Sequence, residues 1–274
     1  MDKIKRNERI AALTRILVSE PNKVMPFSQF CERFGAAKSS ISEDVGIIDE
    51  ALRLQKLGSL ETIAGAAGGV RFRPTGNAQD DSAFMQQVAD ALCDPGRVLP
   101  GGYLYVSDIL ADPGIVRRMG DIIACAWYEA KPDFVLTMET KGIPVAVMAA
   151  NALDVPMVIA RRQSKVYEGS AVNISYVTNR GVIETMSLSR RAVKANQRCL
   201  VVDDLIRGGG TAKGLIALMA EFSVQVAGMS FVLAQDEPAR KRIAGEKSLM
   251  YFTGDGETQK IQVYPAPWLR ADRG

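Results

Sequence analysis

Apolar residues at helical spacing dominate the first fifty residues of the chain. The run from Ile10 to Leu17 has this spacing and stops before Pro21, and a second, shorter pattern covers residues 27–34. Between residues 40 and 52, apolar side chains recur every three or four positions, which would form one buried stripe of a third helix. The stripe consists of Ile41, Val45, Ile48 and Leu52. Ser40–Glu43 fits a capping box, which predicts that the third helix begins near Ser40.

The second and third helices are separated by a tight turn at Gly35, which is typical of a helix-turn-helix. Two short strands are expected next, at residues 59–63 and 70–74, with a glycine-rich segment between them. Three helices and a hairpin are the outline of a winged helix. In such a domain the start of the third helix enters the major groove of DNA, and the return strand follows the backbone or a minor groove. The candidate DNA contacts are Lys38, Ser39, Ser40, Ser42, Glu43, Arg71 and Arg73. A three-helix module for dimerisation or oligomer contacts, with the same core, is the alternative.

Beyond this region the pattern predicts a second domain of a different class. We expect a winged-helix domain over residues 1–74, a polar and turn-prone linker over 75–81, and a second domain over 82–274. After a long amphipathic helix at 115–130, strands and helices alternate as far as residue 233. Such alternation indicates an α/β fold with a mainly parallel sheet flanked by helices, and ligands at the carboxyl ends of the strands.

Residues 200–211 of the second domain carry the strongest chemical signal in the chain. An apolar strand ends in two carboxylates, Asp203 and Asp204, and a loop of three glycines, Gly208–Gly210, leads through Thr211 into a helix. Glycines let backbone N–H groups surround a phosphate, and the helix N-terminus adds partial positive charge. Two carboxylates can accept hydrogen bonds from vicinal hydroxyls. The segment therefore predicts a site for a ribose 5-phosphate. A Walker-type loop is excluded because no Gly-Lys-Ser/Thr follows the glycines.

Composition and charge narrow the function classes. The chain of 274 residues has no histidine, which removes the commonest general base and the commonest transition-metal ligand. Residues 1–74 contain 12 Lys and Arg against 9 Asp and Glu, so that they hold the whole net charge of +3, where a nucleic-acid module would need it. The four scattered cysteines predict reduced thiols and a cytoplasmic protein. No apolar run approaches the roughly 18–20 residues that span a bilayer, so that no membrane partner is expected.

The 200–211 segment resembles the 5-phosphoribosyl 1-pyrophosphate (PRPP) motif of type I phosphoribosyltransferases, although Gly208 stands where most of these enzymes have Thr. The resemblance implies that Thr140, Lys141 and Gly142 wrap the pyrophosphate. It also places Arg161, Arg162 and Lys165 where the family's basic residues face that group, and residues 167–188 where its mobile loop lies. The implied effector contacts are Asp203, Asp204, Leu205, Arg207, Gly208, Gly209, Gly210, Thr211, Thr140, Lys141, Gly142, Arg161, Lys165 and Tyr103.

A winged helix ahead of a phosphoribosyltransferase domain resembles the bacterial purine operon repressor family. Its most distinctive stretches here are residues 38–44, 100–103, 165–170 and 203–211. The resemblance implies a homodimer, a palindromic double-stranded DNA operator, and release from DNA when PRPP binds without catalysis. It also implies guanosine tetraphosphate as a second ligand of the same pocket. No tightly bound cofactor and no protein metal site are expected, while Mg²⁺ could enter with PRPP.

Two other functions compete with this interpretation. The first is an active purine phosphoribosyltransferase, of the xanthine type, with an extra N-terminal module. Gly208 and the lack of an evident catalytic group in the covering loop argue against catalysis, so that we expect no catalytic residue. The second is an RNA-binding attenuator with a similar C-terminal domain, against which a winged helix favours duplex DNA.

Overall fold

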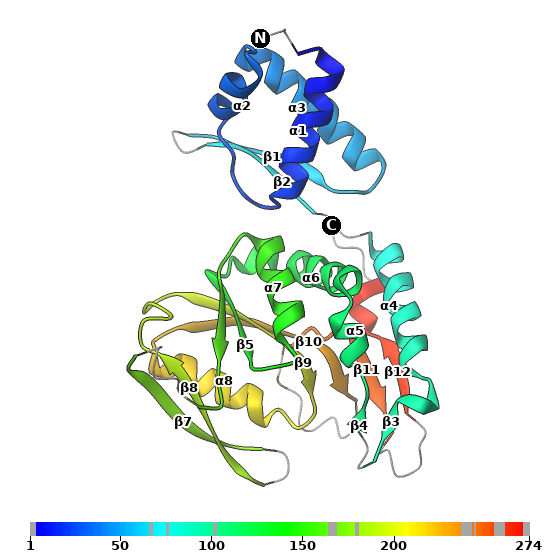
Figure 1. Ribbon diagram of the computed structural model, residues 1–274, viewed down its shortest axis with the longest axis vertical. Coiled ribbons are helices and arrows are strands. Elements are labelled where there is room, and N and C mark those ends of the chain that lie inside the picture. Colours follow the sequence, from blue (N-terminus) through cyan, green and yellow to red (C-terminus); the bar gives the residue numbers. More distant parts are fainter. Residues whose placement is uncertain are drawn as a thin grey trace. The chain divides into compact units, whose positions relative to one another are not determined.

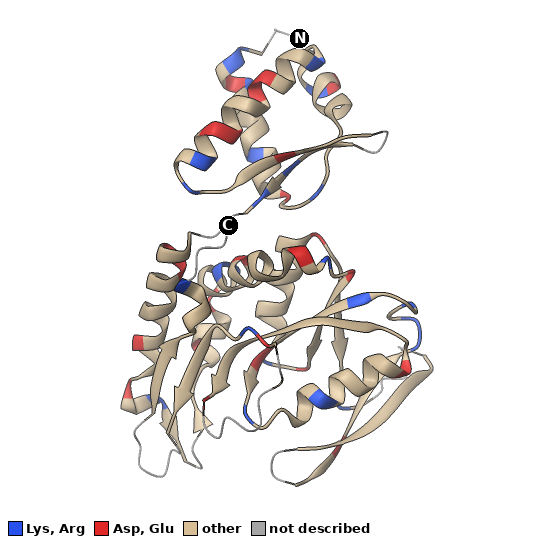
Figure 2. Cartoon of the chain, turned by 180° about the vertical axis from the view of Figure 1, so that it is seen from behind, with Lys and Arg blue, Asp and Glu red and all other residues tan. Residues whose placement is uncertain are grey.

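The computed structural model describes residues 4–65, 68–74, 77–100, 103–163, 169–178, 181–236, 243, 245–254 and 261–270. By its internal contacts the chain divides into two units (Figure 1). The first comprises residues 1–77 with 151–154, and the second comprises residues 78–150 and 155–274. Both signs of charge are spread over the helices of each unit (Figure 2).

The first unit consists of three helices and one hairpin. Its elements are α1 (Arg6–Ser19), α2 (Phe27–Phe34), α3 (Lys38–Leu54), β1 (Ser59–Ile63) and β2 (Gly69–Arg73). The apolar stripe of α3 is buried against Leu13 and Leu17 of α1 and Phe30 of α2, which confirms the predicted stripe. Helix α2 ends at Gly35, whose φ of 57° is left-handed and permits the tight turn into α3. The arrangement is that of a winged helix.

The predicted start of the third helix was wrong. Helix α3 begins at Lys38, after Ala37 in an extended conformation, and no side chain caps it. Ser40 and Ser42 therefore lie inside the helix rather than forming a capping box at its end. The consequence is that Lys38 and Ser39 occupy the first helical turn.

The second unit is built on a six-stranded sheet in the order β12-β11-β10-β9-β5-β6. Every neighbouring pair is parallel except β11 and β12, which are antiparallel. The sheet strands are β5 (Phe134–Met138), β6 (Met157–Ala160), β9 (Arg198–Ile206), β10 (Gln225–Gln235), β11 (Met250–Thr253) and β12 (Gln262–Pro265). The predicted α/β class with a mainly parallel sheet is confirmed.

Helices cover both faces of this sheet, with α6 and α7 on one side and α8 on the other (Figure 1). The helices are α4 (Ala78–Leu92), α5 (Ser107–Ala111), α6 (Pro113–Trp127), α7 (Ile143–Leu153) and α8 (Gly210–Glu221), with 3-10 turns at Pro95–Arg97, Tyr128–Ala130 and Pro267–Arg270. Gly120 of α6 lies against the backbone of Met148 in α7, where a Cβ would be 2.6 Å from the Met148 carbonyl carbon. No helix within the described ranges is both long and apolar enough to cross a membrane.

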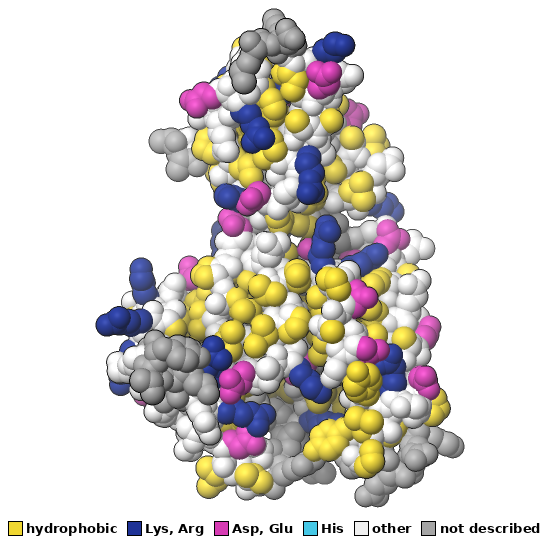
Figure 3. All heavy atoms as spheres, in the orientation of Figure 1, with side chains coloured by type: hydrophobic (Ala, Val, Ile, Leu, Met, Phe, Trp, Pro, Cys, Tyr) yellow, Lys and Arg dark blue, Asp and Glu magenta, His cyan; other side chains and the backbone are white. Residues whose placement is uncertain are grey.

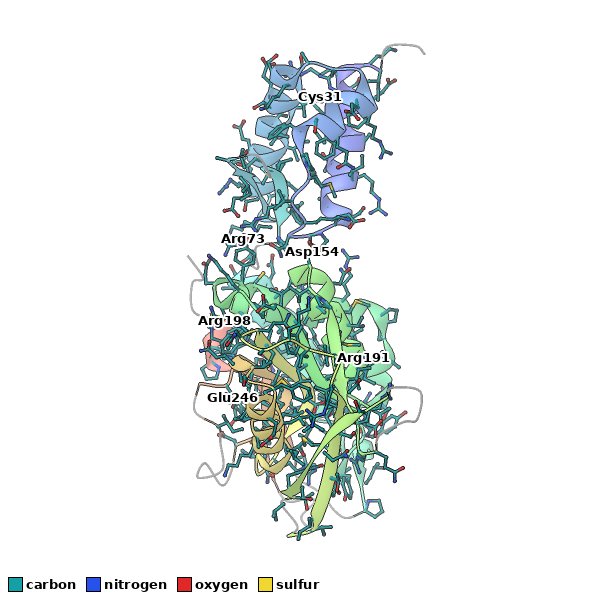
Figure 4. The ribbon with its side chains drawn as sticks, turned by 90° about the vertical axis from the view of Figure 1, so that its left-hand side faces the viewer. Cys31, Arg73, Asp154, Arg191, Arg198 and Glu246 are labelled. Carbon is teal, nitrogen blue, oxygen red and sulfur yellow. The ribbon has the colours of Figure 1, made fainter. Side chains whose placement is uncertain are left out.

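Two hairpins lie outside the main sheet. A short one joins β3 (Val98–Leu99) and β4 (Tyr103–Leu104), and a longer one joins β7 (Ala171–Val177) and β8 (Ile183–Ser189). The longer hairpin packs on α8, where a Cβ on Gly214 would lie 3.0 Å from Cγ of Tyr176. Arg191, at the base of this hairpin, is labelled in Figure 4.

Two boundaries differ from the sequence-based expectation. Strand β9 continues past the acidic pair to Ile206, because Leu205 and Ile206 still pair with β10. Helix α4 begins at Ala78, inside the segment 75–81 that was expected to be the linker. Asp80 and Asp81 lie in its first turn, where acidic side chains favour a helix.

Candidate functional sites

The glycine loop and Asp203 of β9 open into one pocket of about 610 Å³ in the second unit. Gly209 has a left-handed φ of 76° and precedes α8, so the loop places the helix N-terminus at the pocket. Several predicted effector contacts line it: Tyr103, Asp203, Leu205, Arg207, Gly208, Gly209, Gly210 and Thr211. The structure thus brings the PRPP-like motif and the distant Tyr103 to the same cavity.

Burial shapes the electrostatics of the acidic pair. Asp203 is buried, and its Oδ1 accepts a hydrogen bond of 2.9 Å from the backbone N–H of Asp204. Burial, and then the charge of Asp204, raises the pKa of Asp203 well above its usual range. Burial also raises the pKa of Asp204. The hydrogen bond with Asp203 and the charge of Lys141 partly offset this rise by lowering the pKa. A partner that donates hydrogen bonds, such as a diol, would stabilise the ionised pair.

The second predicted loop reaches this pair because β5 lies beside β9 in the sheet. A Cβ built on Gly142 would lie 2.0 Å from Oδ1 of Asp203 and 2.7 Å from Oγ1 of Thr137. Only glycine therefore fits between the loop and the acidic strand. The charge of Lys141 lowers the pKa of Asp204, so Lys141 lies near the acidic pair. Thr140, the residue before Lys141, is exposed.

The basic residues after β6 are engaged within the protein. Nη1 of Arg161 lies 3.6 Å from Oε2 of Glu139, and Oε1 of Glu139 accepts from the backbone N–H of Arg162 at 2.8 Å. Glu139 thus ties the loop after β5 to the loop after β6. Lys165 falls outside the described residues.

Arg207 joins the pocket to two aromatic rings. Its guanidinium carbon lies 5.5 Å from the ring centre of Tyr103 and 5.7 Å from that of Phe252 in β11. These distances are in the cation–π range. Sequence reasoning found Tyr103 and Arg207 by resemblance but missed Phe252, since a core-strand aromatic has no local signal of its own.

The hairpin β7–β8 supplies pocket residues that the sequence did not single out. Thr178, Val182 and Glu184 line the cavity from this hairpin, and Gln235 lines it from the end of β10. A Cβ on Gly210 would lie 2.4 Å from the carbonyl oxygen of Val177, so the hairpin closely approaches the start of α8. The segment expected to cover the substrate does lie beside the glycine loop.

A separate groove of about 620 Å³ runs along the first unit. Lys38 and Ser42 of α3 line it, together with residues of α2 and the hairpin: Pro26, Phe27, Ser28, Cys31, Thr62, Ile63, Ala64, Gly65, Gly68 and Gly69. The ammonium of Lys38 lies 5.9 Å from the centre of the Phe27 ring, and Cys31 is labelled in Figure 4. Ser28 and Thr62 are polar groove residues that sequence analysis missed, because neither belongs to a helix start or a charge cluster.

The other predicted DNA contacts lie outside this groove. Ser39 is exposed and Ser40 half-buried on α3, while Glu43 is exposed and pairs with Nη2 of Arg6 at 3.1 Å. Arg71 and Arg73 alternate with the buried Val70 and Phe72, so they lie on the outer face of the hairpin. The guanidinium of Arg71 donates two hydrogen bonds to Oε2 of Glu61, the residue opposite it on β1.

Asp44 is a buried carboxylate that sequence analysis did not identify. It is 0% exposed and accepts from Nε of Arg9 at 2.6 Å and from Nε of Arg6 at 3.0 Å. The three residues bind α3 to α1. Their spacing of 35 and 38 residues gives no local pattern.

No cluster of three or more potential metal-ligating His, Cys, Asp or Glu side chains occurs in the part of the chain that the structure describes. The carboxylates Asp203 and Asp204 alone could complete the coordination of an ion whose other ligands are phosphate oxygens. Such a donor set fits Mg²⁺ carried by a phosphorylated ligand.

Comparisons with known proteins define the class first. Residues 5–74 match the family model described as bacterial purine repressor, N-terminal, and residues 106–263 match the phosphoribosyl transferase domain. The fold of adenine phosphoribosyltransferase from Thermoanaerobacter pseudethanolicus superposes on 61% of this chain and 99% of that chain, at 20% identity and a TM-score of 0.54. The protein is therefore a winged helix joined to a phosphoribosyltransferase fold.

Relatives that match nearly end to end define the family. The chain is 42% identical over 271 residues to the purine biosynthesis transcriptional repressor PurR of Bacillus subtilis, covering 98% of this chain and 95% of that protein. It is 39% identical to the purine biosynthesis transcriptional activator PurR of Lactococcus lactis, covering 90% of this chain and 92% of that protein. The chain belongs to the bacterial purine repressor family, which confirms the resemblance found in its sequence.

The enzyme alternative receives less support from the comparisons. Xanthine phosphoribosyltransferase of Deinococcus deserti is 34% identical over 158 residues, which cover 54% of this chain and 80% of that enzyme. Its match covers little more than half of this chain, whereas the regulators match it nearly end to end. The relatives of nearly full length are transcription regulators rather than catalysts.

Proposed function

We propose that this protein is a DNA-binding repressor of purine biosynthesis and salvage genes, and that PRPP releases it from a palindromic operator. The observation that carries the proposal is that one chain holds a winged-helix groove and a pocket lined by a glycine cradle and the buried Asp203. Family membership supports gene regulation over catalysis. The names of its relatives include a repressor and an activator.

The DNA interface is the groove with the first turns of α3. Lys38 and Ser42 line the groove and would contact phosphates and base edges. Lys38→Ala should weaken operator binding by about 1–3 kcal/mol if it contacts a base, or lower the salt slope by about one if it contacts a phosphate. Arg15→Ala removes the same charge from an exposed site on α1 and serves as the control.

A genome-wide selection identifies the operator directly. Fragments of the source genome enriched by the protein are sequenced, and enrichment upstream of purine genes is expected. The same fragments then serve in band-shift titrations with the variants. Tighter binding of the matching single-stranded RNA than of the selected duplex DNA would favour the attenuator alternative. An affinity of Lys38→Ala equal to that of wild type at two salt concentrations would remove the groove from the interface.

The effector site is the pocket in the second unit. We infer that the glycine loop holds the 5-phosphate of PRPP, that Asp203 and Asp204 accept from the ribose hydroxyls, and that Thr140–Gly142 face the pyrophosphate. Mg²⁺ would enter bound to the phosphates. Guanosine tetraphosphate, another polyanion, would compete for the same cradle.

The double variant Asp203→Ala/Asp204→Ala tests this assignment. It should bind operator normally but no longer dissociate when PRPP and Mg²⁺ are added, because PRPP drives release only if it binds the free protein more tightly than the complex. Dissociation at the wild-type PRPP concentration would contradict the assignment. Incubation with PRPP, Mg²⁺ and each purine base, followed for pyrophosphate release, tests the enzyme alternative.

A homodimer completes the proposal, since a palindromic operator matches a two-fold protein. Apolar side chains gather over helices α5 to α7 on the face shown in Figure 3, and Val147 of α7 is 41% exposed. This surface could accommodate a second copy. Sedimentation of the wild type and of Val147→Glu would show whether this face holds the dimer together.

A further inference from the structure

Glu184 presents a carboxylate to the cavity that contains the glycine loop and Thr211. It stands on β8, directly opposite Tyr176 of β7. Oε2 of Glu184 accepts a hydrogen bond of 2.7 Å from the Tyr176 hydroxyl. A second carboxylate, besides that of Asp203, thus lies in the pocket whose glycine loop and helix N-terminus favour an anion.

Glu184 lies on the face of the hairpin that packs against α8. Glu184, Met186 and Leu188 alternate along β8, and Met186 and Leu188 are buried. A Cβ on Gly214 of α8 would lie 2.7 Å from the Met186 methyl group and 3.0 Å from the Tyr176 ring, so the hairpin rests directly on α8. The next position toward the glycine loop on that face is Glu184.

Tyr176 connects the carboxylate to the phosphate cradle. Burial raises the pKa of Tyr176 to about 12, assisted by its hydrogen bond to Glu184 and opposed by a hydrogen bond to Thr211 and by Arg162. The phenol therefore keeps its proton and lies between the Glu184 carboxylate and the Thr211 hydroxyl. Glu184 and Thr211 line the same cavity, so a phosphate on the cradle would share that cavity with the Glu184 carboxylate.

The charges facing Glu184 do not neutralise it fully. Nη1 of Arg162 lies 3.9 Å from Oε2 of Glu184, and the Arg162 side chain is 63% exposed. An exposed pair at this distance contributes little attraction and is screened by salt. A phosphate and a carboxylate that share one partly buried pocket repel each other appreciably.

We infer that Glu184 is a specificity-determining residue of the effector pocket, whose carboxylate opposes the phosphate of the ligand and so raises the concentration at which the pocket fills. This inference rests on the proposed anion-binding function of the pocket. It predicts a preference for ligands that bring a divalent cation, because a cation offsets the carboxylate as well as the phosphate. The hairpin then sets the threshold of the response as well as covering the pocket.

The test is the isosteric substitution Glu184→Gln in the full-length chain. A glutamine oxygen can still accept from Tyr176, so only the charge is removed. Titration calorimetry with ribose 5-phosphate without Mg²⁺, at low and at high NaCl, measures the affinity. Glu184→Gln should bind roughly three- to thirtyfold more tightly than wild type at low salt, and the gain should shrink at high salt.

Glu221→Gln is the matched control, because it removes the same charge at the exposed C-terminal end of α8. It should bind as wild type does. Glu184→Ala removes the same charge and replaces Glu184→Gln if the latter fails to fold. Equal or weaker binding by the Glu184 variants would overturn the inference while leaving the pocket intact. No heat of binding from wild type or from any variant at millimolar ligand would instead contradict the proposed function, and the inference with it.

Discussion

The candidate sites of the two units differ in how much side chains and backbone contribute to them. In the winged helix, side chains on a helix and a hairpin make much of the candidate surface, and two of its charged members are already paired: Glu43 with Arg6, and Arg71 with Glu61. In the second unit, close-packed backbone forms part of the site, because glycines stand where a Cβ would collide with Asp203 or with Val177. Where side chains form a site, one substitution removes one contact and leaves the others. Where glycine backbone is closely packed, one substitution displaces the neighbouring groups as well.

The largest expected effect comes from breaking the charge cluster between α3 and α1, formed by Asp44, Arg6 and Arg9. Asp44→Ala would leave Arg9, whose side chain is only 12% exposed, without its partner. Removing one member of a buried pair costs about 3–5 kcal/mol, and we expect the lower end because Arg6 is half exposed. Both tryptophans, Trp127 and Trp268, lie in the second unit. Circular dichroism should therefore show an earlier unfolding step that tryptophan fluorescence does not.

The control for this prediction is Glu43→Ala. Glu43 pairs with Arg6 on the surface, where a single ion pair contributes about 0–1 kcal/mol. Equal loss of stability in Asp44→Ala and Glu43→Ala would mean that burial does not set the strength of this cluster.

The second prediction tests the backbone-built site. Gly142→Ala places a methyl group against Asp203 and Thr137, and overpacking of this kind costs about 1–3 kcal/mol. If the displaced Asp203 loses its ligand contacts, affinity for PRPP should fall by about ten- to a hundredfold, while operator binding persists. Calorimetric titration measures the affinity, and wild-type affinity in Gly142→Ala would show that the loop can move aside without consequence.

The third prediction concerns pH and the helices of the second unit. Burial raises the pKa of Asp121 in α6 to about 6, with Asp81 adding to it and Arg117 and Arg118 opposing it. The folded state therefore binds a proton that the unfolded state, with a carboxyl pKa near 3.9, does not bind between about pH 4 and 6. The contribution of this group to stability falls as pH rises through that window.

Asp121→Asn removes that dependence. At pH 7.5 it should be more stable than wild type by roughly 1–2 kcal/mol, allowing for partial solvent screening, and at pH 4 the two should be nearly equal. Thermal unfolding followed by tryptophan fluorescence at both pH values measures the difference. A constant difference across pH would indicate a packing effect in place of titration.

The smallest expected effect is on the stability of the winged helix and concerns a glycine in α3. Gly46 lies inside α3, and a Cβ there meets nothing within 4 Å. Gly46→Ala should therefore raise the free energy of unfolding of the first unit by about 0.5–1 kcal/mol, through helix propensity alone. Circular dichroism melts measure it, and a loss of stability would contradict the distinction between the two kinds of site.

Much of the fold could be predicted from the sequence because the information is local. The period of Ile41, Val45, Ile48 and Leu52 predicted the buried face of α3, and the alternation of strands and helices predicted a parallel sheet. The order of carboxylates, glycines and threonine predicted the loop that lines the pocket. The helix start was missed because Ser40 and Glu43 imitate a cap, while α3 begins at Lys38 without one.

Only the tertiary structure decided which charges meet. Asp44 and Arg9 are 35 residues apart, and nothing in their local sequence marks Asp44 for burial. The cross-strand register sets Glu61 opposite Arg71 and Glu184 opposite Tyr176, and a shift of one residue would turn each to the other face. The sequence by itself determined the elements, their order and the phosphate loop, since periodicity and backbone freedom act over a few residues. The pairing of side chains across the fold depends on register and packing, which involve residues far apart in the chain.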